Sequence, residues 1–285
     1  MSVCRKTSTK MIDPRLLQVV GDFLYPYLEN DRPALIGPPL IGIAGSQGSG
    51  KSTLAAHLAK SLGGVSLSLD DVYRTKAERQ ALGRTLHPLF ETRGPPLTHD
   101  LDLLDQVLRD LQRARPDSRT PLPAFDKLAD DRCPQSEWPV FVGRPKIIIL
   151  EGWCLGAEPE PDEQLCAPIN DMEAKLDPDA TWRRAINGAL AAGYADLRAR
   201  LDGLIYLRAP SFERVLDWRC QQEAGLMGVA EVDEDRRRAL KGFIARFERL
   251  TRWMMQGGIV ADLEIRLDDG RRFIASPQEA PISEG

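Results

Sequence analysis

The stretch GIAGSQGSGKST, residues 42–53, constrains this chain more than any other part of its sequence. It contains four glycines and directly follows the apolar residues Leu40 and Ile41. Glycine loses more backbone entropy on folding than other residues and contributes no packing. A bound group outside the polypeptide is therefore expected to offset that cost. The spacing fits G-x-x-x-x-G-K-S/T, the pattern of a loop whose backbone wraps a phosphate.

Each position of this loop is assigned to phosphate binding. The predicted nucleotide-binding residues are Gly45, Ser46, Gln47, Gly48, Ser49, Gly50, Lys51, Ser52 and Thr53. Inward-facing N–H groups and the positive end of the following helix favour an anion. Lys51 is expected to reach the β- and γ-phosphates of ATP, and the Ser52 hydroxyl is expected to bind Mg²⁺. The alternative, a turn with a chance lysine, is disfavoured because a strand precedes the loop and a helix follows it.

Predicted strands and helices alternate along the chain. Strands are expected at 40–45, 63–71, 146–152 and 202–210, with a last strand or hairpin at 263–275; helices are expected at 14–28, 51–62, about 100–114, 178–200, 211–225 and 233–255. The strand at 146–152 shows no polar alternation, which is typical of a parallel strand covered on both faces. The order predicts an α/β fold of the P-loop NTPase kind, a doubly wound parallel sheet with helices on both faces.

We divide the chain into three parts. Residues 1–34 are predicted to form a tail and a helix, residues 35–275 a P-loop kinase domain, and residues 276–285 a C-terminal tail. Within the domain, about 74–145 is interpreted as an acceptor-binding insertion, irregular from about 82 apart from the helix near 100–114. The segment at about 208–230 is interpreted as a helical lid.

Composition excludes several classes of protein. The chain of 285 residues is 42% hydrophobic and 28% charged with a formal net charge of −4, so a nucleic-acid-coating protein is disfavoured. No apolar stretch approaches the roughly 20 residues that span a bilayer, and the N-terminus has no apolar core of a secretory signal. Five cysteines without a C-x-x-C pair favour reduced thiols. We expect a cytoplasmic protein without nucleic-acid or membrane partners, whose oligomeric state is left open.

Acidic residues follow two of the predicted strands. Glu151 ends the strand at 146–150, where ligands bind in this fold class, and is predicted to help hold the metal. Its alternative is a cap of the next helix. Asp70 and Asp71 end the strand next to the phosphate-binding loop, and an aspartate there can take a proton from a substrate hydroxyl. Asp70 is favoured as this base over Asp71, and one of the pair can instead cap a helix.

Two observations favour a small-molecule kinase over a regulatory GTPase. The chain contains no N-K-x-D motif for reading guanine. The inserted region before residue 146 is also large enough to build an acceptor site. The predicted catalytic set is Lys51, Asp70, Glu151 and Arg219. Arg271 and Arg272, after the last strand, are candidates for contact with adenine.

Several longer segments resemble a known family. They are SLDDVY, RGPPLTHDL, PAFDKLADDR, SEWP, ILEGWCLG, INDMEAKLD and DWRCQQE, in that order, within about 36–270. Together they resemble the D-glycerate 3-kinase family and its glycerate-kinase-like P-loop relatives, which are related to uridine and pantothenate kinases. The resemblance implies ATP-dependent phosphorylation of D-glycerate. A uridine- or pantothenate-type kinase and a regulatory P-loop ATPase remain the alternatives.

The resemblance also implies roles for individual residues. Asp70 and Tyr73 match the element that bears the base, and Glu151 and Trp153 match EGW. The substrate side is matched by Arg93, His99, Asp100, Asp126, Lys127 and Arg132, and the start of the lid helix by Arg219 and Glu223. Phe125 replaces the family's usual tyrosine, so a hydroxyl contact is lost.

Physical reasoning about these positions leaves alternatives open. A carboxylate-bearing acceptor needs a fixed cation such as Arg93, Lys127 or Arg132. His99 lies in a polar loop and is either a surface residue or helix cap, or a ligand of the substrate. Asp126 can instead make a local turn. Arg219 can neutralise the transferring phosphoryl group or lie on a solvated helix face.

Overall fold

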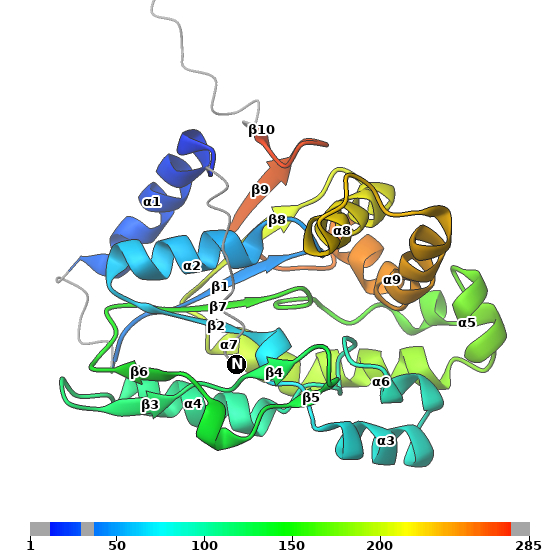
Figure 1. The fold of residues 1–285 in the computed structure, drawn as a ribbon, viewed down its shortest axis with the longest axis horizontal. Coiled ribbons are helices and arrows are strands. Elements are labelled where there is room, and N and C mark those ends of the chain that lie inside the picture. The colour runs from blue at the N-terminus through cyan, green and yellow to red at the C-terminus, as the bar shows by residue number, and fades with distance from the viewer. Residues whose placement is uncertain (1–11, 30–36, 275–285) are drawn as a thin grey trace, which may run out of the picture.

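The computed structural model describes residues 12–29 and 37–274 of the chain. Its centre is a six-stranded sheet with the order β10-β9-β8-β1-β7-β2 (Figure 1). The strands are β1 Leu40–Gly45, β2 Val65–Ser68, β7 Ile148–Gly152, β8 Gly203–Arg208, β9 Leu263–Leu267 and β10 Phe273–Ile274. The predicted tails at 1–10 and 276–285, and the predicted domain boundaries at 34/35 and 275/276, lie outside the described residues.

The inner strands are parallel, as their sequences predict. β1 pairs in parallel with β7 on one side and with β8 on the other. All residues of β1 and β7 are buried, because helices cover both faces of the sheet. Only the terminal pair departs from this pattern, since β10 pairs antiparallel with β9. The predicted doubly wound α/β fold is confirmed, with an antiparallel strand at one edge.

Helices cover the sheet on both sides. Figure 1 shows α1 and α2 above the sheet and α4, α6 and α7 below it. The helices are α1 Pro14–Leu28, α2 Lys51–Leu62, α4 Leu101–Gln112, α6 Thr181–Ala189, α7 Ala195–Ala199, α8 Phe212–Met227 and α9 Glu234–Met255. The helix predicted over 178–200 is divided into α6 and α7 by a π-helical segment at Leu190–Tyr194.

The helix α1 packs on the same core as the sheet. Its buried residues Leu16, Val20 and Leu24 belong to the main hydrophobic cluster. Gly203 of β8 lies close beneath this helix, because a Cβ at that position would be 2.9 Å from Phe23. The N-terminal helix is therefore part of the folded unit that carries the site.

The region expected to be irregular contains more order than its sequence indicates. A helix, α3 Lys76–Thr85, begins with a capping box formed by Thr75 and Glu78. Two small antiparallel sheets pair β3 Arg119–Pro121 with β6 Val140–Val142 and β4 Phe125–Asp126 with β5 Asp131–Arg132. Strands of two or three residues are too short for alternation to reveal them. The expectation of an irregular region is wrong in these segments.

The remaining elements are short. They are α5 Asp171–Leu176 and the 3₁₀ turns η1 Leu69–Asp71, η2 Pro88–Glu91, η3 Gln135–Glu137 and η4 Asp162–Leu165. Within residues 12–29 and 37–274, no helix combines the length and apolar character that crossing a bilayer requires.

Candidate active site

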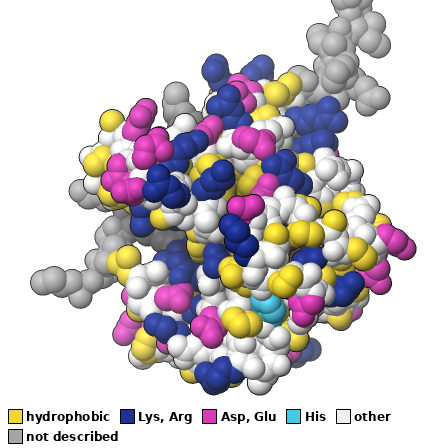
Figure 2. Space-filling model, turned by 90° about the vertical axis from the view of Figure 1, so that its right-hand side faces the viewer, with side chains coloured by type: hydrophobic (Ala, Val, Ile, Leu, Met, Phe, Trp, Pro, Cys, Tyr) yellow, Lys and Arg dark blue, Asp and Glu magenta, His cyan; other side chains and the backbone are white. Residues whose placement is uncertain are grey.

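The carboxyl ends of the parallel strands meet at one side of the molecule. This is the right-hand side of Figure 1, where α8 and α9 also lie. Figure 2 views that side and shows hydrophobic side chains across its middle, between groups of basic and acidic side chains. Ligands of open α/β sheets bind at this edge. The predicted phosphate-binding loop and both predicted acids lie there.

The phosphate-binding loop leads from the last residue of β1, Gly45, to the first residue of α2, Lys51. Gly48 and Gly50 have φ angles of 78° and 96°, which side-chain-bearing residues rarely adopt. A Cβ on Gly48 would also lie 2.8 Å from the Cβ of Trp218. Glycine is thus required at Gly48 both for its backbone angle and for the close approach of α8.

The loop contains buried hydroxyl groups without a hydrogen-bond partner among the described residues. Ser46 and Ser49 are buried, and their Oγ atoms have no hydrogen-bond partner among the described residues. The Gln47 side-chain oxygen is also buried without a partner there. Buried polar groups in folded proteins are generally hydrogen-bonded. The hydroxyls and the glycine backbone therefore fit a group rich in oxygen, such as the phosphates of a nucleotide.

Glu151 joins this loop to the neighbouring strand. It lies in β7 and is buried, and its Oε1 accepts hydrogen bonds from Ser52 Oγ at 2.8 Å and from Ser68 Oγ at 2.7 Å. The Lys51 ammonium lies 3.8 Å from Oε2. A carboxylate beside a serine hydroxyl is a donor set that suits Mg²⁺. The described residues contain no group of three or more His, Cys, Asp or Glu that could hold a metal.

Asp70 lies one turn beyond β2, in η1. Its carboxylate accepts a hydrogen bond from the Tyr73 hydroxyl at 2.8 Å and pairs with Lys127 Nζ at 2.7 Å. Burial alone would raise the pKa of Asp70, but the charges of Lys127 and Lys51 outweigh it and hold the pKa below its usual range. Asp70 is therefore ionised in this arrangement. Asp71 faces elsewhere, since it lines a separate cavity with Val107 and Leu122.

Tyr73 and His99 form one wall of the site. They are joined by an antiparallel bridge, and their rings stack at 4.6 Å. His99 is buried, and its Nδ1 shares a hydrogen bond of 2.6 Å with the Tyr194 hydroxyl. Burial lowers the pKa of His99 to about 4, so the ring is neutral. Of the two alternatives left open for His99, the surface position is therefore wrong, because this part of the insertion folds inward.

The three cations predicted for the acceptor are all paired with carboxylates. Arg93 contacts Asp130, Lys127 contacts Asp70, and Arg132 contacts Asp100 at 2.9 Å. Asp100 also caps α4 by accepting a hydrogen bond from the Leu103 N–H at 3.0 Å. The structure thus brings these cations to one cluster around Asp70 and Tyr73, each with a neutralising partner.

Two neighbouring positions of the insertion behave differently. Asp126 is exposed and accepts hydrogen bonds from the N–H groups of Leu128 and Ala129. This is the local turn that its sequence allowed as the alternative. Phe125 is buried, and its ring meets that of Tyr73 edge-on at 5.3 Å. The guanidinium of Arg93 lies over the Phe125 ring at 5.5 Å, so this phenylalanine packs against both Arg93 and Tyr73.

Trp153 is a buried wall of the site. Its Nε1 donates to the Gly94 carbonyl at 2.9 Å, and its ring contacts Phe247 of α9 at 4.9 Å. Trp153 therefore connects the end of β7 with the insertion and with α9.

The predicted lid corresponds to α8. Its first half belongs to the core, with Val215 and Trp218 buried. Arg219 is held by Glu223 at 3.1 Å and by Gln222 at 2.9 Å. Glu223 also contacts Arg236 of α9, so the two arginines share this carboxylate.

Sequence reasoning missed the contact between α8 and the phosphate-binding loop. Arg271 Nε donates to the Gly48 carbonyl at 2.6 Å, and the Arg271 guanidinium lies over the Trp218 ring at 5.0 Å. Arg272 instead is exposed and pairs with Asp268 at 3.4 Å. Sequence reasoning also missed Ser68 and Tyr194 as residues of the site. Ser68 could have been found from its polar side chain at the end of an apolar strand, whereas the sequence around Tyr194 offered no such signal.

Comparison with known proteins relates this chain to kinases. Residues 40–183 match the model of the phosphoribulokinase/uridine kinase family. The uncharacterized kinase mug58 of Schizosaccharomyces pombe is 32% identical over 225 residues, covering 74% of this chain and 79% of that protein. A chloroplastic D-glycerate 3-kinase of Arabidopsis thaliana is 30% identical over 226 residues, covering 74% of this chain and 46% of that protein.

Solved structures share the fold. The D-glycerate 3-kinase from Cryptococcus neoformans var. grubii has a TM-score of 0.73 at 24% identity, covering 91% of this chain and 98% of that chain. The protein YGR205w has a TM-score of 0.66 at 24% identity, covering 91% and 96%. At these identities the likeness is one of fold.

Proposed function

Because the chain belongs to the phosphoribulokinase/uridine kinase family, we propose that it transfers the γ-phosphoryl group of ATP to a hydroxyl of a small anionic metabolite. We propose D-glycerate as this acceptor and 3-phosphoglycerate as the product. The observation that carries the proposal is the position of Asp70. Its ionised carboxylate lies 2.7 Å from Lys127, near the phosphate-binding loop. A base and a cation at one place suit an acceptor that has both a hydroxyl and a carboxylate.

The nucleotide would rest on residues 45–53. Lys51 would pair with the β- and γ-phosphates, and Ser52 and Glu151 would hold Mg²⁺, which supplies positive charge that neutralises the phosphates. Arg219 would leave Glu223 and neutralise charge on the transferring group. The contact of Ser52 and Lys51 with Glu151 supports this assignment.

Asp70 would act as the general base. It would take the proton of the acceptor hydroxyl while the hydroxyl oxygen forms a bond to the γ-phosphorus. The bond between that phosphorus and its bridging oxygen breaks, and ADP leaves. Tyr73, which donates to Asp70 at 2.8 Å, would keep the carboxylate in place.

The acceptor would bind among the cations of the insertion. Its carboxylate would replace a protein carboxylate as the partner of Arg93, Lys127 or Arg132. If Lys127 makes this exchange, Asp70 is released when the substrate arrives. His99 and Trp153 complete the proposed acceptor site, whereas Asp126, whose carboxylate holds a local turn, is not part of it. The 30% identity with a protein named D-glycerate 3-kinase supports the choice of acceptor.

A substrate panel tests the proposal. Purified protein with Mg²⁺ and ATP is offered D-glycerate, uridine and pantothenate, and formation of ADP and of the phosphorylated product is measured. We expect product from D-glycerate alone. Lys51→Ala should lose turnover while keeping its fold, whereas Lys60→Ala, on the exposed face of the same helix, should keep turnover.

Other outcomes would identify another function. Product from uridine or pantothenate would replace the proposed acceptor. Slow ATP hydrolysis that none of the three compounds changes would favour a regulatory ATPase. Full turnover in a folded Lys51→Ala protein would contradict the role of the phosphate-binding loop.

A further inference from the structure

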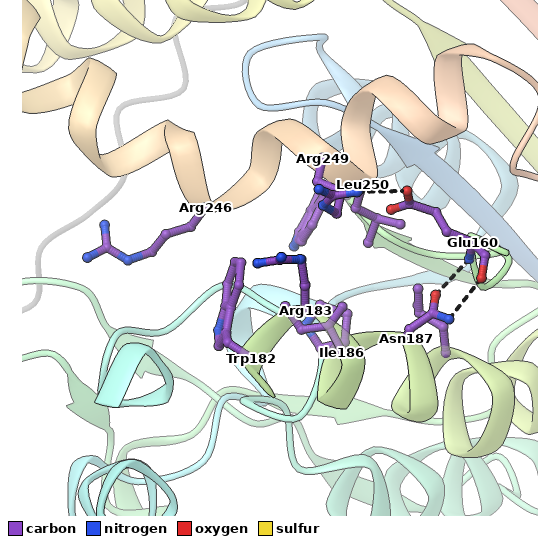
Figure 3. Close-up of a pocket in the computed structure, with 11 residues that line it drawn as sticks. Glu160, Trp182, Arg183, Ile186, Asn187, Arg246, Arg249 and Leu250 are labelled. Carbon is purple, nitrogen blue, oxygen red and sulfur yellow. Dashed lines mark hydrogen bonds and ion pairs between the residues drawn. The ribbon is translucent and has the colours of Figure 1, made fainter. Parts of the chain in front are cut away.

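A small cavity lies between α6 and α9, apart from the phosphate-binding loop. Trp182 and Arg183 line it from α6, and Arg246 and Arg249 line it from α9 (Figure 3). Its volume is about 20 Å³, which is room for about one water-sized group. The cavity can therefore admit one oxygen atom of a small anion.

Trp182 supplies a hydrogen-bond donor that has no acceptor. The chain has five tryptophans, and its other four indole N–H groups donate to the carbonyls of Cys133, Gly94, Asp269 and Glu158. Trp182 is 2% exposed, and its Nε1 has no partner in the described part of the chain. Leaving a buried N–H without an acceptor costs free energy. The unpaired indole N–H therefore indicates that the cavity can bind a group with a hydrogen-bond acceptor.

Two of the three arginines that line the cavity are already neutralised. Arg183 pairs with Asp177 at 2.9 Å and also donates to backbone carbonyls. Arg249 pairs with Glu173 at 2.7 Å and with Glu160 at 3.1 Å. Figure 3 shows these two guanidinium groups near one another, whereas Arg246 stands apart from them.

Arg246 is the exception. Its Nη1 donates to the Gly242 carbonyl at 3.3 Å, but its Nε is buried without a partner. Across residues 12–29 and 37–274, no carboxylate lies within ion-pair distance of it. Burial without a neutralising charge lowers the pKa of Arg246. Neither Nε nor Nη2 has a hydrogen-bond partner among the described residues, and these two nitrogens form the edge that binds carboxylates through two parallel hydrogen bonds.

We propose that this cavity binds the carboxylate of a small organic acid. Arg246 would hold the two carboxylate oxygens through Nε and Nη2, and Trp182 Nε1 would donate to one of them. Arg183 and Arg249 keep their own carboxylate partners, so Arg246 supplies the positive charge that the bound carboxylate would neutralise.

The rest of the acid has room outside the cavity. Arg246 also lines an open groove of about 530 Å³ between α5 and α9. Met172, Leu176 and Phe243 give this groove an apolar wall, and the ion pair of Lys175 with Asp171 at 3.2 Å also lines it. A carboxylate held by Arg246 can therefore carry a short carbon chain that extends toward solvent.

The acid can come from two sources with the same chemistry. Trp153 lines the cavity on the side of β7, so the carboxylate can belong to the phosphoryl acceptor itself. In that case the inference rests on the proposed function. It can also belong to a second acid that binds beside the acceptor site, and then the inference is independent of which acceptor is used.

Nuclear magnetic resonance of the indole groups tests the proposal without requiring kinase activity. The full-length ¹⁵N-labelled protein is titrated with sodium acetate, with sodium D-glycerate and, as a control of ionic strength, with sodium chloride. We expect the Trp182 signal, assigned through its loss in Trp182→Phe or by sequential assignment, to shift in a saturable way with a carboxylate but not with chloride. A Trp182 signal that neither carboxylate moves would overturn the proposal.

Matched variants place the ligand on Arg246. Arg246→Gln should weaken the response to carboxylate about tenfold or more, because it removes the charge-assisted pair of hydrogen bonds. Arg238→Gln, which changes an exposed arginine paired with Asp235 on the same helix, should leave the response unchanged. An equal response in Arg246→Gln and the unaltered protein would also overturn the proposal.

The two carboxylates then distinguish the sources. A response to D-glycerate alone, with a raised KM for D-glycerate in Arg246→Gln, assigns the cavity to the acceptor. A response to acetate as well, with an unchanged KM for the acceptor, assigns it to a second acid. Loss of all kinase activity on the panel would refute the proposed function while leaving the indole titration to decide the carboxylate site.

Discussion

Asp70 is the residue whose surroundings matter most for the proposed chemistry. Its carboxylate lies between Lys127 at 2.7 Å and the Tyr73 hydroxyl at 2.8 Å. Burial acts to raise its pKa, and the two lysine charges act to lower it and prevail. A base must be ionised before the substrate arrives, and these neighbours keep Asp70 in that state.

Replacing Asp70 tests the base directly. Asp70→Asn should lower kcat by about 10²–10⁴-fold, because the variant cannot take the hydroxyl proton. ATP affinity, measured by calorimetry with Mg²⁺ present, should change little. Asp71→Asn is the matched control and should keep most of the turnover. A larger loss in Asp71→Asn than in Asp70→Asn would assign the base to Asp71.

The contact with Lys127 gives a pH prediction. Lys127→Met removes a charge that lowers the pKa of Asp70, while burial continues to raise it. The pKa of Asp70 should therefore rise, and the acid limb of the kcat profile should move to higher pH. Lys60→Met, which changes an exposed lysine of α2, should leave the profile in place. An unshifted acid limb in Lys127→Met would show that this contact does not control Asp70.

At the scale of elements, the loop between β1 and α2 depends on how α8 packs against it. Gly48 lies against Trp218, and Arg271 donates to the Gly48 carbonyl at 2.6 Å. The motif predicts a glycine at this position for phosphate binding. The packing of α8 adds a second reason for glycine at this position. Trp218 is 170 positions away in sequence, and it contacts Gly48 because the chain returns to this edge of the sheet.

Substituting this glycine should weaken nucleotide binding. Gly48→Ala places a side chain at a φ of 78° and a Cβ 2.8 Å from Trp218. We expect a loss of about 1–3 kcal/mol in the free energy of unfolding. The distorted loop should also bind ATP about tenfold more weakly, a change of about 1.4 kcal/mol.

A second glycine supplies the control for this change. Gly225→Ala, in α8 with open space around it, should be neutral or stabilising by up to about 1 kcal/mol. Calorimetry and urea unfolding measure both effects. Unchanged ATP affinity in Gly48→Ala would contradict the packing argument.

The elements themselves were predicted to different degrees. The bounds of α2 and the parallel pairing of β1 and β7 follow from a glycine pattern and from unbroken apolar runs. The short strands within the insertion were not predicted, because β4 and β5 contain two residues each and depend on contacts such as that of Arg79 with Asp130. Short strands of this kind are stabilised by their surroundings more than by their own sequence.

At the scale of the whole molecule, buried polar groups join segments that are distant in sequence. His99 and Tyr194 are 95 residues apart and share a hydrogen bond of 2.6 Å. Arg249 of α9 is likewise joined to Glu173 of α5 at 2.7 Å. Such pairs link the acceptor side of the site to the helices that cover the sheet, so stability and site geometry depend on the same contacts.

His99 should make stability depend on pH. Its pKa is about 4 in the folded protein against a usual 6.5, so the unfolded chain binds a proton that the folded protein does not. The contribution is complete above the unfolded pKa and is lost as the pH falls toward the folded pKa. Loss of this contribution should lower the free energy of unfolding by up to about 3 kcal/mol.

Urea unfolding between about pH 7 and pH 4 measures this effect. The free energy of unfolding should fall more steeply with acid in the unaltered protein than in His99→Gln. His57→Gln, on the exposed face of α2, should follow the unaltered protein. Parallel curves for His99→Gln and the unaltered protein would show that His99 does not carry the dependence.

Local patterns in the sequence were sufficient for the phosphate-binding loop, the parallel strands and the acid at the end of β7. Each of these rests on neighbouring residues, whose spacing and polarity dictate backbone geometry without reference to distant parts of the chain. The partners of these groups came only from the folded arrangement. Lys127 reaches Asp70 across 57 residues and Tyr194 reaches His99 across 95, because the insertion and the α6–α7 segment both fold back over the same edge of the sheet. Which charged groups pair and which become buried depends on how these segments fold back, and no local pattern in the sequence encodes that arrangement.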